Sequence, residues 1–155
     1  MRYFPMVLAL LAAPLLLPLQ LPADDQPPDF SGSWQLDSSK SPGIDLDSVT
    51  LTIQNDSGKF NFTRVARERG GKEITSHFTC EAGGATCTYD EGGYKAKVSL
   101  WYQGAALVVL KTDGPKEDSV SQWKLELSNK NTLKVEFSHI EPTEKSENLV
   151  FEKKP

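Results

Sequence analysis

The stretch that decides the fold is Asp29-Phe30-Ser31-Gly32-Ser33-Trp34-Gln35-Leu36-Asp37-Ser38-Ser39-Lys40-Ser41. It begins the folded part of the chain, and it predicts a first strand over residues 32 to 36. Gly32 provides a position without a side chain, over which the indole of Trp34 can fold inward. Trp34 is therefore expected to be buried at one end of a closed β-barrel.

The rest of the chain reads as short strands separated by turns rich in Gly, Asn, Asp and Pro. Strands are expected over residues 49–54, 59–67, 72–80, 86–89, 94–102, 105–112, 120–128, 133–139 and 148–153. Their spacing is typical of an antiparallel sandwich or barrel. Because nearly every link is short and closure satisfies the edge strands, we predict an all-β, antiparallel up-and-down meander barrel of about 8–10 strands. An immunoglobulin-like sandwich is the less favoured alternative.

Residues 1 to 23 have the order of a secretory signal peptide, with Arg2 first, an apolar run next and Ala23 before an acidic pair. An uncleaved membrane anchor is the alternative, but prolines interrupt the apolar run, which falls short of the roughly 20 residues that a spanning helix needs. We therefore predict a signal peptide (1–23), a linker (24–28), a barrel domain (29–155), and a secreted or periplasmic protein without a membrane span.

The composition argues against several classes of partner. Arg2 is the one charged residue of the predicted signal peptide, so cleavage lowers the number of basic side chains from 17 to 16. With 21 acidic side chains, the predicted mature chain has a net charge of −5. No basic run is dense enough to compete for phosphates, which disfavours nucleic-acid binding. About 130 residues make one domain, for which we expect a monomer and no cofactor.

Cys80 and Cys87 flank a Gly83-Gly84 pair, and an exported chain meets an oxidising compartment in which such a pair persists as a disulfide. If the two glycines form a two-residue turn, the cysteines face each other at a Cα separation within disulfide range. A redox role is the alternative, but the spacing is not Cys-x-x-Cys and nothing nearby would activate a thiolate. We predict a structural disulfide.

Three motifs resemble those of a family of small exported lipocalin-like bacterial proteins of uncharacterised function. They are the opening stretch 29–41, a late strand pair in 123–135, and residues 149–153. The resemblance implies a lipocalin-like barrel. Lipocalins proper share the motif matched by Gly32 and Trp34. In them a cationic side chain from a late strand lies against the tryptophan, and the resemblance implies that Lys153 has this role here. The chain lacks an evident C-terminal helix of the lipocalin kind.

Catalytic and metal sites find little support in the sequence. His77, Cys80 and Cys87 could be zinc ligands, but positions 77 and 80 of a regular strand point to opposite faces. The chain has two histidines, His77 and His139, and no nucleophile motif lies near either. We therefore predict neither a catalytic residue nor a metal site.

Arg64, Arg67 and Arg69 could form an anion site, although a charged hairpin tip is usually just solvated. Arg64 differs because the alternation of the strand places it on the same face as Phe60 and Phe62. Its side chain is therefore predicted to point into the barrel, where a charge needs a partner. The side chains predicted to face inward are mostly large: Val49, Leu51, Ile53, Phe60, Phe62, Val98, Leu100, Trp123, Leu125, Leu127, Leu133, Val135 and Phe137. We expect them nearly to fill the barrel, leaving a shallow pocket toward one mouth.

Two functions are compatible with such a barrel. One is a non-catalytic binding module for a small apolar or amphipathic ligand at the mouth, with Arg64, Tyr102 and His139 as its polar contacts. The other is an envelope or extracellular interaction protein with a filled barrel and no small-molecule ligand. An enzyme ranks third.

Overall fold

The computed structural model describes residues 26–114 and 117–155. The predicted signal peptide and the first two residues of the predicted linker lie outside this described part. Within it, no helix is long and apolar enough to cross a membrane.

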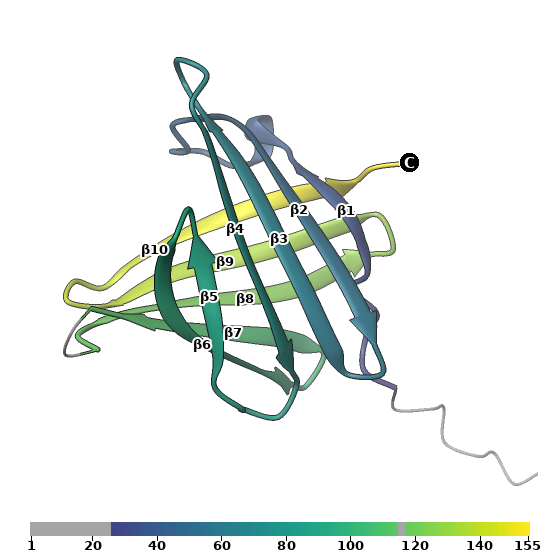
Figure 1. Cartoon of the computed structure of the whole chain (residues 1–155). Coiled ribbons are helices and arrows are strands. Elements are labelled where there is room, and N and C mark those ends of the chain that lie inside the picture. Colours follow the sequence, from purple (N-terminus) through teal and green to yellow (C-terminus); the bar gives the residue numbers. More distant parts are fainter. Residues whose placement is uncertain (1–25, 115–116) are drawn as a thin grey trace, which may run out of the picture.

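Ten antiparallel strands form one closed barrel (Figure 1). They are β1 (Gly32–Leu36), β2 (Leu46–Asp56), β3 (Lys59–Glu68), β4 (Glu73–Glu81), β5 (Cys87–Glu91), β6 (Tyr94–Gln103), β7 (Ala106–Asp113), β8 (Ser119–Asn129), β9 (Thr132–Glu141) and β10 (Lys145–Lys153). Each strand pairs with its sequence neighbours, and β1 also pairs with β10, which closes the barrel. The predicted up-and-down topology is confirmed. Between β1 and β2 the chain makes one short 3-10 helix, η1 (Ser38–Lys40).

Trp34 organises one end of the barrel. Its side chain is fully buried, and its Nε1 donates a hydrogen bond to the carbonyl of Phe30 at 3.0 Å. Lys153 Nζ lies 5.3 Å from the centre of the indole. Gly32 has a φ of +145°, and a Cβ there would lie 2.7 Å from Lys153 Cε. Glycine is favoured at this position because its φ is one that other residues rarely adopt, and a Cβ would also displace the end of the Lys153 side chain.

The segment before β1 closes the same end. Phe30 is fully buried and packs against Tyr102, whose hydroxyl donates a hydrogen bond to the carbonyl of Pro28 at 3.4 Å. Phe60 also packs against the Tyr102 ring, edge to face, at a centroid distance of 6.1 Å. Pro28, the last residue of the predicted linker, thus already contacts the barrel.

Cys80 and Cys87 form a disulfide with a Cα separation of 5.7 Å. The chain turns at Gly83-Gly84 as expected, and the register of β4 with β5 continues to Cys80 opposite Cys87, but the turn residues Ala82 to Gly84 also contact β6. There the amides of Gly83 and Gly84 both donate to the carbonyl of Leu100 at 3.0 Å. The reason is that β5 begins only at Cys87, opposite Val98, so the part of β6 beyond it needs another hydrogen-bonding partner.

The core follows the alternation of the strands. Almost all of the side chains predicted to face inward lie in the buried cluster or pack against it. Phe137 is the exception, since it lies outside that cluster and instead stacks on Trp123 at a centroid distance of 5.8 Å. The period of two thus identifies the inward face of the barrel correctly.

Candidate functional site

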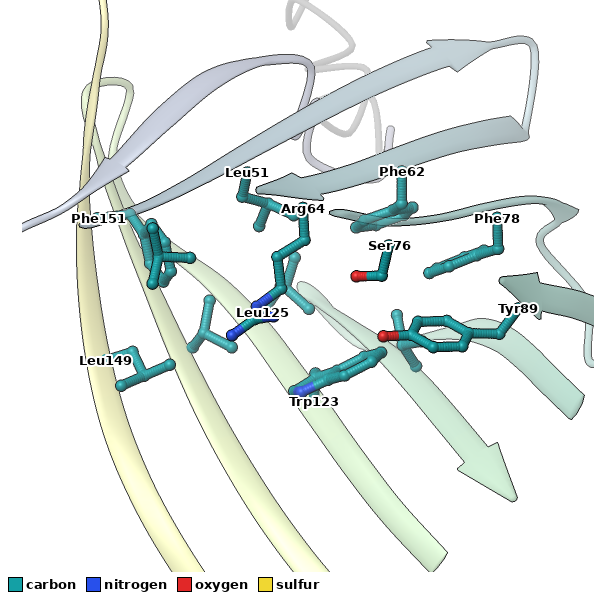
Figure 2. A pocket seen from close by; sticks show the side chains of 13 residues that line it. Leu51, Phe62, Arg64, Ser76, Phe78, Tyr89, Trp123, Leu125, Leu149 and Phe151 are labelled. Carbon is teal, nitrogen blue, oxygen red and sulfur yellow. The ribbon is translucent and has the colours of Figure 1, made fainter. Parts of the chain in front are cut away.

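A cavity lies inside the barrel (Figure 2). Its volume is about 60 Å³, which is above the roughly 10–15 Å³ that a cavity needs to hold one water molecule. The lining comes from eight strands and consists of Val49, Leu51, Phe62, Arg64, Ser76, Phe78, Tyr89, Val109, Trp123, Leu125, Val135, Leu149 and Phe151. The interior is therefore nearly filled, as the large inward-facing side chains predict.

Four of the lining side chains carry polar atoms toward the middle of the cavity. Figure 2 shows Arg64, Ser76, Tyr89 and Trp123 pointing toward one another from four strands. The remaining lining residues are aliphatic or phenylalanine, so the environment of these polar atoms is mainly apolar.

Arg64 reaches the cavity because it continues the alternation that turns Phe60 and Phe62 inward on β3. Its side chain is partly exposed, which means that solvent reaches the cavity. Among the residues that the structure describes, no carboxylate lies within ion-pair distance of Arg64. The interior thus holds a positive charge without an internal counter-charge.

Arg67 and Arg69, the other candidates for an anion site, do not join Arg64. Arg67 Nη2 lies 3.4 Å from Glu73 Oε2, and Arg69 Nε lies 3.0 Å from Asp45 Oδ1. Both arginine side chains are exposed at the tip of the β3–β4 hairpin. The three arginines therefore do not form one anion site.

Tyr89 and Ser76 are the buried polar residues of the cavity. The Tyr89 hydroxyl donates a hydrogen bond to Glu91 Oε2 at 2.7 Å. Burial raises the pKa of Tyr89 to about 12, the hydrogen bond with Ser76 opposes this rise, and Glu91 adds to it. The positive charge of Arg64 also lowers this pKa, which indicates that the two side chains interact. Tyr89 is thus a neutral hydrogen-bonding group at ordinary pH.

Besides Glu91, two further charges lie next to Tyr89, and these two pair with each other. Lys111 Nζ lies 4.9 Å from the centre of the Tyr89 ring and 3.0 Å from Asp113 Oδ2. Burial acts to raise the pKa of Asp113, but hydrogen bonds from Lys111 and Ser119 and the charge of Lys111 bring it below its usual value. This lysine therefore has a counter-charge, unlike Arg64.

The structure separates the three side chains predicted to contact a ligand. Arg64 lines the cavity, whereas Tyr102 lies at the end closed by Trp34 and bonds to the segment before β1. Burial and the charge of Asp29 raise the pKa of Tyr102. His139 lies near the opposite end of the barrel, where its ring meets that of Phe137 at 4.6 Å. Neither Tyr102 nor His139 lines the cavity.

Sequence reasoning assigned no site role to Ser76, Phe78, Tyr89 or Trp123. Their phase was available in the pattern, because Phe78 and Ser76 lie two and four residues before Cys80, and Tyr89 lies two residues after Cys87. A disulfide across two strands requires both cysteines on one face, so these residues share that face.

The zinc ligand set considered from the sequence does not come together. His77 is exposed on the outer face, while Cys80 is buried and joined to Cys87. Across residues 26–114 and 117–155, no group of three or more His, Cys, Asp or Glu side chains is arranged to hold a metal ion.

Comparison with known proteins places the fold. Fatty-acid-binding protein 1 of Echinococcus granulosus superposes with a TM-score of 0.60 at 13% identity, over 81% of this chain and 98% of that one. The chain has a fatty-acid-binding-protein-like and lipocalin-like barrel. Zebrafish ileal bile acid-binding protein complexed with cholic acid gives a TM-score of 0.53 at 17% identity, covering 81% and 98% of the two chains. Secretory abundant heat soluble protein 4 of Ramazzottius varieornatus gives a TM-score of 0.56 at 11% identity, over 81% of this chain and 94% of that one.

These identities establish the fold alone. No family model matches the chain, and no curated protein matches it. The resemblance to small exported bacterial proteins therefore stays a prediction.

Proposed function

We propose that the protein is a non-catalytic binding barrel for a small apolar or amphipathic molecule that carries an acidic group. The observation that carries this proposal is Arg64, whose charge lies in a mainly apolar cavity without an ion-pair partner among the described residues. An unpaired charge in such an environment is unfavourable. A carboxylate or similar anion would pair with it through charge-assisted hydrogen bonds, which are stronger than neutral ones.

The apolar part of the ligand would pack against the aliphatic and aromatic lining. This division of labour, a largely apolar pocket with a few polar groups that orient the ligand, is usual for small-molecule sites. Two barrels of similar fold carry the names of fatty-acid-binding and bile acid-binding proteins, and both names describe acids with large apolar parts. These names support the proposal.

The small volume of the cavity favours a second candidate function. The free interior of this barrel is only about 60 Å³, whereas typical ligand pockets have volumes of roughly 300–1,000 Å³. An envelope or extracellular interaction protein with a filled barrel would need no interior space. We rank it second because it does not account for an arginine turned inward without a counter-charge.

The proposed place of action is the periplasm or the extracellular space. The support is the signal-like order of residues 1 to 23 together with the Cys80–Cys87 disulfide, since disulfides persist in oxidising compartments.

Native mass spectrometry of protein purified from its own host tests the proposal. A binding barrel should show an added mass that disappears on denaturation. The matched variant Phe62→Trp enlarges a lining side chain and should lose the added mass while remaining folded. A wild-type protein that appears only at the mass of its polypeptide, and that does not bind added benzoate or decanoate, would favour the interaction protein.

A further inference from the structure

The rings that line the cavity form one continuous series. Phe62 and Phe78 stack at a centroid distance of 4.7 Å with 12° between their planes. Phe78 and Tyr89 are 6.3 Å apart, Tyr89 and Trp123 are 6.2 Å apart, and each of these pairs is tilted by 38°. Successive rings thus turn gradually and present an extended aromatic surface on one side of the cavity (Figure 2).

The last contact of this series crosses the barrel interior. Tyr89 on β5 and Trp123 on β8 are separated in the sheet by β6 and β7. Their rings can meet because small side chains lie between them, with Ala96 directly opposite Tyr89 on β6 and Val109 directly opposite Trp123 on β7. The aromatic surface therefore arises from barrel closure and is not a simple ladder along one pair of strands.

The size of the cavity limits what can rest on that surface. About 60 Å³ is less than the roughly 150 Å³ of an apolar cavity that holds one benzene ring, so even a ligand with a single ring would lie partly in the solvent-accessible opening of the cavity. An alkyl chain of ten or more carbons would have to leave most of its length outside. A planar ring can stack on the aromatic side chains, an attraction that a saturated ring of similar size lacks.

We propose that the ligand is a planar aromatic carboxylate with one ring, whose acid group pairs with Arg64 and whose ring stacks on Tyr89 and Trp123. This inference rests on the proposed function and narrows it to one class of acid. The Tyr89 hydroxyl is neutral at ordinary pH and donates to the Glu91 carboxylate, so the acid group of the ligand belongs on the Arg64 side of the cavity, away from Glu91.

The test compares three acids on the wild-type protein by NMR titration, with the backbone amide signals of the residues that line the cavity as reporters. Benzoate and cyclohexanecarboxylate share the acid group and the number of ring carbons, and they differ in planarity and aromaticity. Decanoate supplies the same acid group on an alkyl chain. We expect benzoate to bind at least about fivefold more tightly than cyclohexanecarboxylate, and decanoate not to exceed benzoate. Because cyclohexanecarboxylate is the more apolar acid, a simple hydrophobic site would give the opposite order.

A pair of variants assigns the preference to the cavity. Trp123→Leu should reduce the ratio between the two ring acids to near one, whereas Trp101→Leu, on the outer face of β6, should leave the ratio unchanged. Equal binding of the two ring acids by wild-type protein, or tighter binding of decanoate, would overturn the inference while the proposed function stands. Failure of all three acids to bind would contradict both.

Discussion

The indole of Trp34 is buried at one end of the barrel. Its Nε1 donates a hydrogen bond to the carbonyl of Phe30, and Lys153 lies over its ring. Truncation of a fully buried aromatic side chain costs about 3–5 kcal/mol, so Trp34→Ala should lower the free energy of unfolding by that amount. Lys153→Met removes the cation over the indole and should lower the free energy of unfolding by less, about 0.5–2 kcal/mol. Urea denaturation measures both changes, and Lys154→Met is the control. An unchanged urea midpoint for Trp34→Ala would refute its organising role.

Tyr89 should be visible in an alkaline titration. Its pKa, raised to about 12 by burial, means that an unfolded chain loses this proton near pH 10 while the folded chain keeps it. The unfolded state then binds fewer protons, so the stability that Tyr89 contributes is complete below about pH 10 and is lost as the pH rises to about 12.

The measurement is the ultraviolet absorbance of tyrosinate as the pH rises. In Tyr89→Phe the component that titrates near pH 12 should disappear, whereas Tyr94→Phe, which removes an exposed ring, should retain it. A late component that persists in Tyr89→Phe would show that burial does not act on this hydroxyl.

Among the elements, β4 and β5 share one of the two shortest registers of the barrel wall, the other being that of β1 with β10. Their register contains three residue pairs, Ser76–Glu91, His77–Asp90 and Phe78–Tyr89, and the Cys80–Cys87 disulfide continues it covalently. Phe78 and Tyr89 line the cavity, so this wall also shapes the candidate site. The disulfide therefore supports a part of the barrel wall in which few residue pairs join the two strands.

Reduction of this disulfide should destabilise the protein by about 2–3 kcal/mol, because the bond restricts a small loop in the unfolded chain. Urea unfolding with and without reductant measures the change. Intact mature protein should also gain the mass of two protons on reduction. A protein that already carries two free thiols after non-reducing purification from its host would contradict both the bond and the predicted oxidising compartment.

At the scale of the whole molecule, the sequence predicts the closed meander well, because short turns and alternating residues are local features. It also places Arg64 on the inward face, through its phase with Phe60 and Phe62. It does not predict that Tyr89 meets Trp123, since that contact crosses the interior and exists only once the barrel has closed. The hydrogen bonds of Gly83 and Gly84 with Leu100 on β6 are missed for the same reason, because the partner lies further along the chain.

The account as a whole depends on Arg64 being the acid-binding group of the interior. Calorimetric or NMR titration with benzoate and decanoate, on wild type, Arg64→Met and Arg67→Met, tests this most directly. Loss of charge-assisted hydrogen bonds should weaken binding by Arg64→Met about ten- to hundredfold, and removal of an unpaired interior charge should leave its unliganded form at least as stable as wild type. Arg67→Met should bind as wild type does. Equal affinities for Arg64→Met and wild type would contradict the account.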